Sequence, residues 1–272
     1  MVKKRKITAE DLYQFEIISG SEISPDGKNI LFTVQRVDQK TEKKYSNIWV
    51  VPTDGGAPKQ FTYGHQVDVN PKWSPDGKKI AFISNRHDEK QPQLYIIPFS
   101  GGEAKKVTDL KGFFGNFTWS PDSRKIAFSF TKMDKEQIEL LEDEKKKKLG
   151  IVYRRYDRVF FKFDGHGFLP HEHEHIWILD LKTEKPKQLI SGDKYDESIQ
   201  CWTPDGKYLL FLSNRSQDPD FEPEATDIYL IKPTGGVFKL LKTPYGPKGG
   251  FSISPDGKTL AYIGRLGKGD WW

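Results

Sequence analysis

The sequence predicts an all-β protein, a β-propeller made of four-stranded antiparallel blades. The first observation is a turn motif, Ser or Thr followed by Pro-Asp and then Gly or Ser, which occurs five times. Its copies begin at Ser24, Ser74, Ser120, Thr203 and Ser254. The second observation is their spacing of 50, 46, 83 and 51 residues. A repeat of about 40–50 residues is typical of propellers, in which each copy forms one blade.

Each turn motif is expected to join two strands of a blade. Pro presets the backbone for the first corner of a tight turn, Asp bonds back to its own backbone, and Gly accepts the left-handed conformation that ends the turn. A second pair of apolar runs follows in three copies, the first being 47–52 and 58–62 around a Gly-Gly turn. Two hairpins of this kind make one four-stranded blade. Three of the motifs follow a tryptophan that is expected to pack between blades: Trp73, Trp119 and Trp202.

Thr8 and Asp11 have the spacing of a capping box, so we expect a helix over 8–19. The blades follow, with blade 1 at 22–62, blade 2 at 69–108, blade 3 at 117–190, blade 4 at 199–241 and a half blade 5 at 250–272.

The 83-residue interval between the third and fourth motifs has two interpretations, two short blades or one blade with an insertion. Only one outer strand pair is visible there, at 175–180 and 187–190, and no further Pro-Asp turn intervenes. We therefore favour an insertion at 132–174, between the second and third strands of blade 3. It should contain a polar helix over 135–148 and an aromatic, basic strand over 151–161. Long insertions on a rigid scaffold are where function concentrates.

The half blade at the end of the sequence has only its first two strands. Ordering about 14 residues costs ~20 kcal/mol, whereas burying its five large apolar side chains returns at most ~10–15 kcal/mol. Open strand edges also favour pairing with other chains, so self-association through these edges is expected. On this basis we expect the sequence to be a fragment of a longer polypeptide.

Composition excludes several classes of protein. The 272 residues, 36% hydrophobic and 30% charged, suit one large domain of many short strands. No apolar run approaches the ~18 residues of a membrane span, and the basic start lacks the apolar core of a secretory signal. The single cysteine, Cys201, rules out an internal disulfide, which favours a cytoplasmic location. The net charge of +5 is mild, and the run 145–148 follows an acidic stretch, so we expect a solvated helix and no nucleic-acid partner.

Several motifs together resemble one family. They are the opening 7–12, the string Ser-Asn-Arg at 84–86 with its echo at 213–215, and the segments 155–157 and 164–169 of the insertion. The sequence resembles the N-terminal propeller of the prolyl oligopeptidase family of serine peptidases, in its acylaminoacyl-peptidase branch. The Pro-Asp-Gly repeat alone is shared with TolB-like propellers.

The resemblance implies a seven-bladed propeller that caps a C-terminal α/β-hydrolase domain and admits short or unstructured peptides. This sequence lacks the last two and a half blades and the hydrolase domain, and no Gly-x-Ser-x-Gly string occurs in it. The catalytic Ser, Asp and His of the family lie in the hydrolase domain, so no catalytic residue is assigned here. The chain alone is expected to hydrolyse nothing, and its expected partners are the hydrolase domain and a peptide substrate.

The insertion supplies the candidate substrate-facing residues. They are aromatic and cationic: Tyr153, Arg154, Arg155, Tyr156 and Arg158. With the hydrolase domain in place, such a lip could meet a peptide's carboxylate or backbone. The alternative is an inserted hairpin that packs on the rim of the propeller.

A histidine cluster is the one local group with ligand chemistry. On an extended strand, residues two apart share a face, so three imidazoles could converge on a metal. The cluster consists of His171, His173 and His175. No further ligand is specified, so we favour a solvated polar segment leading into a strand and assign no metal or cofactor. The remaining loop histidines have no partner that the sequence identifies: His65, His87 and His166.

The sequence is compatible with three functions. The leading hypothesis is the non-catalytic, substrate-gating propeller portion of a serine peptidase acting on short or N-acylated peptides. The alternative is a stand-alone TolB-like propeller that binds a protein partner. An independent enzyme would need a metal at the histidine cluster and is least favoured.

Overall fold

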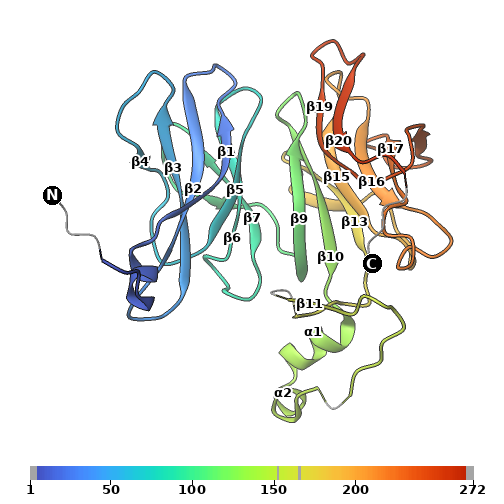
Figure 1. Ribbon diagram of the computed structural model, residues 1–272, viewed down its shortest axis with the longest axis horizontal. Coiled ribbons are helices and arrows are strands. Elements are labelled where there is room, and N and C mark those ends of the chain that lie inside the picture. Colours follow the sequence, from blue (N-terminus) through green and yellow to red (C-terminus); the bar gives the residue numbers. More distant parts are fainter. Residues whose placement is uncertain (1–4, 152, 165–166, 268–272) are drawn as a thin grey trace. The chain divides into compact units, whose positions relative to one another are not determined.

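The computed structural model describes residues 5–151, 153–164 and 167–267. The chain divides into two units, Met1–Asp109 and Leu110–Trp272, which we call the first and second units. In both, antiparallel strands follow one another in chain order across each sheet (Figure 1). The predicted all-β fold of four-stranded antiparallel blades is therefore confirmed.

The first unit contains two four-stranded blades and a short helix. The helix η1 spans Ala9–Gln14 and is of the 3-10 type. Blade 1 consists of β1 (Ile17–Ile23), β2 (Asn29–Val37), β3 (Lys44–Pro52) and β4 (Lys59–Gln60). Blade 2 consists of β5 (Asp68–Trp73), β6 (Lys79–Ser84), β7 (Gln93–Pro98) and β8 (Lys105–Lys106).

The second unit contains two complete blades, a two-stranded sheet and the insertion. Blade 3 consists of β9 (Gly112–Trp119), β10 (Lys125–Lys132), β13 (Glu174–Asp180) and β14 (Lys185–Gln188). Blade 4 consists of β15 (Glu197–Trp202), β16 (Leu209–Asn214), β17 (Thr226–Ile231) and β18 (Lys239–Leu241). The last sheet pairs β19 (Lys248–Ile253) with β20 (Leu260–Gly264).

The insertion lies between the second and third strands of blade 3, where the sequence placed it. It contains α1 (Lys135–Glu142), α2 (Glu144–Leu149), β11 (Lys162–Phe163) and β12 (Gly167–Phe168). Both helices extend beyond the end of β10, outside the sheet (Figure 1). The one helix expected over 135–148 is thus two, because Asp143 has an extended backbone and its carboxylate accepts from the N–H groups of Lys145 and Lys146. An N-cap residue of this kind cannot continue the preceding helix.

Two further expectations were wrong. The helix predicted over 8–19 ends at Gln14, because the β-branched pair Ile17 and Ile18 aligns with β2 as the start of β1, so blade 1 begins before residue 22. The strand predicted over 151–161 does not form in its described part. The Phe161 carbonyl accepts from the N–H of Leu169 at 2.8 Å beside the hairpin of β11 and β12, but no strand is formed before it, and the N–H of Val159 donates to the Asp220 carboxylate at 2.9 Å.

The turn motifs have the conformation that their residues favour. In the first copy the Ser24 hydroxyl donates to Asp26 Oδ1 at 2.6 Å and accepts from the N–H of Asn29, and the N–H of Lys28 also donates to Asp26. The same three bonds recur in all five copies. The fourth position has a φ of 57–72° in every copy, and Ser123 adopts this left-handed conformation without being glycine.

The turn aspartates should make folding sensitive to acid. The pKa of Asp205 is lowered to about 2, because the Thr203 hydroxyl and then the backbone N–H of Lys207 donate to the charged form. The pKa is also lowered at the other four positions: Asp26, Asp76, Asp122 and Asp256. A carboxyl whose folded pKa lies below its unfolded value of about 3.9 stabilises the fold above that value, and this contribution is lost as the pH falls toward 2.

We therefore expect stability to fall between about pH 5 and pH 2, with proton uptake on unfolding. Asp205→Asn should remove about one proton from that uptake at pH 3, measured from the pH dependence of urea midpoints. Asp54→Asn is the control, because this exposed carboxylate accepts no hydrogen bond from the described residues. An equal effect of both substitutions would contradict the assignment.

The buried cores lie between neighbouring blades. In the first unit, Leu31 and Ile48 of blade 1 pack with Trp73 and Phe82 of blade 2. In the second unit the corresponding cluster joins blades 3 and 4 and includes Trp202. The inter-blade role expected of these two tryptophans is confirmed, and Trp119 is also buried.

Candidate functional site

The insertion contacts blade 4 through several residues, among them Arg158. Arg158 Nη2 lies 3.5 Å from a carboxylate oxygen of Asp196, just before β15, and 3.8 Å from one of Asp220, in the loop between β16 and β17. The bond from Val159 N to Asp220 adds a backbone contact beside it. Arg158, one of the five candidate substrate-facing residues, therefore contacts two carboxylates of the neighbouring blade.

His171 joins two parts of the insertion. Its Nε2 lies 2.9 Å from the backbone oxygen of Arg155, and its Nδ1 lies 3.3 Å from the Asp134 carboxylate. Both ring nitrogens face acceptors, so the imidazole is satisfied as the doubly protonated cation. The Arg155 carbonyl and then the Asp134 carboxylate raise the pKa of His171 accordingly.

His173 and His175 contact two other carboxylates. His173 Nδ1 lies 3.0 Å from Asp196, whereas His175 Nδ1 lies 2.5 Å from Glu197 and its Nε2 3.0 Å from the Gly192 carbonyl. Burial lowers the pKa of His175, but Glu197, the Gly192 carbonyl and the charge of Asp196 together outweigh burial and leave the pKa raised. The two residues are only 7% and 3% exposed, so the expected solvated segment is wrong for them.

The histidine cluster does not converge on one point. Each of its three imidazoles contacts a different carboxylate, and the described residues contain no group of three or more His, Cys, Asp or Glu side chains arranged for a metal. The carboxylates that hold the histidines lie at least 22 residues away in sequence, which is why the pattern alone did not show them.

Glu197 is the centre of a buried charge cluster between blades 3 and 4. Its side chain is 2% exposed; one oxygen accepts from His175 and the other pairs with Arg215. The neighbouring Glu174 has its pKa raised to about 7, first by burial and then by the charges of Asp196 and Glu197. This cluster ties the start of β13 to the start of β15.

The Ser-Asn-Arg motifs build matching ion pairs in the two units. Arg86 Nη2 lies 3.0 Å from both oxygens of Asp68, at the start of β5, as Arg215 pairs with Glu197 at the start of β15. Both arginines also lie over aromatic rings, namely Phe82 and Tyr95 in one unit and Tyr195, Tyr229 and Phe238 in the other. The motif therefore has a structural role in each unit.

The insertion exposes a surface of large apolar and cationic side chains. Tyr153 is 84% exposed, the Arg154 guanidinium lies 4.1 Å from the centre of the Phe168 ring, and Tyr156 stacks on the same ring at 5.7 Å. The Arg155 side chain is exposed. We call the following exposed group the aromatic patch: Leu149, Ile151, Tyr153, Tyr156, Val159, Phe160, Phe161, Phe163 and Phe168. The hollow beside Tyr156 measures only about 10 Å³, so a ligand would meet a surface here.

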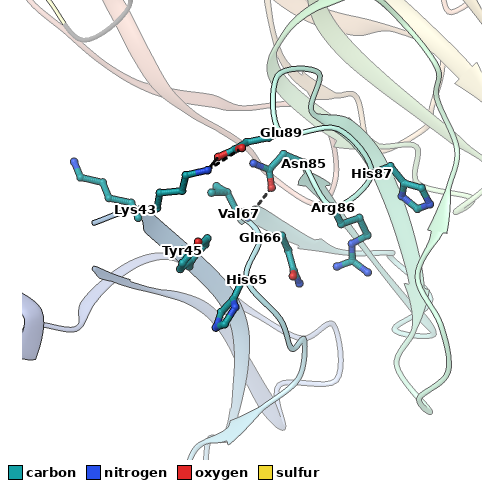
Figure 2. Close-up of a pocket in the computed structure, with 10 residues that line it drawn as sticks. Lys43, Tyr45, His65, Gln66, Val67, Asn85, Arg86, His87 and Glu89 are labelled. Atoms are coloured by element: carbon teal, nitrogen blue, oxygen red, sulfur yellow. Dashed lines mark hydrogen bonds and ion pairs between the residues drawn. The ribbon is translucent and has the colours of Figure 1, made fainter. Parts of the chain in front are cut away.

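A pocket in the first unit was not predicted. It has a volume of about 270 Å³ and lies where the loop before β3, the segment before β5 and the loop after β6 meet (Figure 2). Its lining is polar: Lys43, Lys44, Tyr45, His65, Gln66, Val67, Asn85, Arg86, His87 and Glu89. His65 stacks on Tyr45, and His87 Nδ1 lies 2.7 Å from the Tyr95 hydroxyl, so two of the loop histidines have partners. His166 lies outside the described residues.

Comparison with protein-family models gives one match, the PD40 family, described as the TolB beta propeller domain, over residues 6–153. This is more than half of the chain. The chain belongs to the TolB β-propeller family. The four-stranded sheets and the turn motifs of this propeller agree with that assignment.

Relatives of this propeller include proteins named as peptidases. It is 31% identical over 228 residues to a protein named uncharacterized peptidase YuxL of Bacillus subtilis, covering 84% of this chain and 34% of that protein. It is 28% identical over 272 residues to dipeptidyl-peptidase 5 of Porphyromonas gingivalis, covering 94% of this chain and 38% of that protein. The predicted resemblance to peptidase propellers is thereby confirmed, and the chain spans about a third of the length of these relatives.

A solved structure supports the fold. The acylaminoacyl peptidase of Pyrococcus horikoshii superposes with a TM-score of 0.64 at 21% identity, over 85% of this chain and 33% of that one. Among the described residues, none of the helices has the length and apolar character needed to cross a membrane.

Proposed function

We propose that this propeller is the non-catalytic portion of a serine peptidase that acts on short or N-acylated peptides, and that it controls access of these peptides to the catalytic domain. The peptidase relatives support the peptidase context. The gating role and the substrate class are inferred from the exposed side chains of the insertion. A cytoplasmic location remains a prediction from the sequence.

The observation that carries the proposal is an exposed aromatic and cationic surface on a fixed support. Exposed rings contact one another here, Tyr156 with Phe161 and Phe168, and Phe160 with Phe163. Exposed apolar surface of this kind marks an interaction site. Arg158 and His171 hold the insertion in place, so the patch is ordered before a ligand arrives. Arg154 and Arg155 would then meet a peptide carboxylate, while the rings pack on its side chains.

The test is kinetic and uses the propeller joined to its hydrolase domain. Arg154→Ala combined with Arg155→Ala should raise KM about three- to thirtyfold, since two exposed ion pairs contribute about 0.3–1 kcal/mol each. The value of kcat should not change, because neither side chain touches the reacting atoms. Lys182→Ala with Lys185→Ala is the matched control, because it removes two exposed charges from the outer hairpin of the same blade.

An unchanged KM for several peptides would refute the substrate-facing role. A stand-alone TolB-like propeller that binds a protein partner would then be favoured. In that case the aromatic patch should still matter, and Tyr153→Ala should weaken capture of the partner without affecting any peptide kinetics.

A further inference from the structure

The two ends of the insertion meet at one carboxylate. Asp134 lies between β10 and α1, and its Oδ1 accepts from the backbone N–H groups of His171 and Glu172 at 3.0 and 3.2 Å. Its Oδ2 lies 3.3 Å from His171 Nδ1. The other ring nitrogen of His171 lies 2.9 Å from the Arg155 carbonyl, within the insertion. Asp134 and His171 therefore join the segment that leaves blade 3 to the segment that returns to it.

The contacts of His171 and His175 need the doubly protonated imidazole. Each ring has an acceptor at both nitrogens, whereas a neutral imidazole has only one N–H to donate. For His175 the acceptors are the Glu197 carboxylate at 2.5 Å and the Gly192 carbonyl at 3.0 Å. Loss of the second proton leaves one acceptor of each ring facing a nitrogen lone pair, so one contact of each ring becomes repulsive.

Glu174 lies between these histidines in sequence and needs to stay neutral. Its carboxyl group lies over Gly115 of β9, in space that a Cβ at that position would fill. Burial and then the charges of Asp196 and Glu197 raise its pKa to about 7. Above that pH it becomes a third anion beside two others, which repel it. Glu174 and the two imidazoles therefore all lose a favourable state as the pH rises.

The charges around this joint change their balance with pH. Among the described residues, the anions that face the three titrating groups are Asp134, Asp157, Asp196 and Glu197. The cations that contact these anions from neighbouring positions are His173, Arg158 and Arg215. Only the two arginines keep their charge at every relevant pH. Above neutrality the joint therefore gains the charge of Glu174 and loses that of its imidazoles.

We propose that this joint is a pH-dependent latch, which holds the insertion on blades 3 and 4 at mildly acidic pH and releases it above neutrality. The pKa values of His171, Glu174 and His175 are all raised in the closed structure. A group that binds its proton more tightly in the closed state favours that state at low pH, and the advantage is lost as the pH rises through the raised pKa. The latch acts on the insertion whatever the aromatic patch binds, so it does not depend on the proposed peptidase role.

The test measures the mobility of a nitroxide label on the insertion by electron paramagnetic resonance. The label is attached to Tyr153→Cys, at an 84% exposed position, in the 272-residue chain carrying Cys201→Ser. Between about pH 5.5 and about pH 8.5 the ratio of mobile to immobilised label should rise at least about tenfold, because one unit of raised pKa favours the closed state tenfold. A label at Lys182→Cys, in the exposed turn between β13 and β14, should show no change.

Two variants should change the response in opposite directions. Glu174→Gln stays neutral and should reduce the rise in mobility, whereas His171→Gln lacks the cation and should increase mobility already at about pH 5.5. His65→Gln, in the first unit, is the matched control and should leave the response unchanged. Misfolding only increases mobility, so it cannot produce the result expected of Glu174→Gln. Equal mobility of the label at both pH values, an unaltered response in His171→Gln and Glu174→Gln, or the same change at position 182 would overturn the proposal.

Discussion

Replacing Glu197 with glutamine is expected to lower the free energy of unfolding by about 3–5 kcal/mol. The carboxylate is 2% exposed and contacts two cations, His175 and Arg215, which come from different blades. Glutamine keeps the shape but removes the charge, so the buried His175 and the partly exposed Arg215 lose their compensation. Removing one partner of a buried ion pair is costly for this reason, even though the intact pair adds little net stability.

Urea denaturation followed by circular dichroism measures this change. Glu103→Gln is the matched control, because Glu103 is exposed and has no ion pair among the described residues, and it should change stability by less than about 0.5 kcal/mol. Amide exchange should rise at the start of β13 and β15 in Glu197→Gln. A loss below about 1 kcal/mol would mean that the cluster is solvated and does not join the blades.

The blades could be predicted because the turn motif determines its own structure locally. Ser24, Asp26 and Asn29 bond to one another within six residues, so the motif needs no distant partner. The position of the insertion could be predicted as well, because it follows from the interval between two turn motifs. The strand expected over 151–161 could not, because its aromatic residues have strand propensity but are assigned to no strand of a sheet in the described structure.

The candidate site was less predictable, because its contacts join residues far apart in sequence. His175 pairs with Glu197 and Arg158 with Asp220, and neither pairing leaves a local pattern. The alternation of His and Glu at 171–175 is compatible with metal ligands, with solvated side chains or with buried ion pairs. Only the positions of Asp134, Asp196 and Glu197 in the fold decide among them. The pocket of the first unit was missed for the same reason, since its lining comes from three connections.

Trp202→Ala should cost about 3–5 kcal/mol of unfolding free energy, the range for deleting a large buried aromatic side chain. The ring is 7% exposed and packs in the cluster that joins blades 3 and 4, and its Nε1 donates to the Thr118 carbonyl at 3.3 Å. Trp202→Phe keeps most of the apolar contact and loses the hydrogen bond, so it should cost about 1–2 kcal/mol. Tyr208→Ala, at a half-exposed ring of the same blade, should cost less than either.

The location of this damage distinguishes inter-blade packing from a general loss of stability. The buried residues around Trp202 all lie between Ala127 and Ile231, in the second unit. Amide exchange in Trp202→Ala should therefore rise in β10, β13 and β16, while β2 and β6 of the first unit keep their protection. Uniform loss of protection across both units would show that the units unfold as one cooperative body and that the tryptophan does not act through the joint between blades 3 and 4.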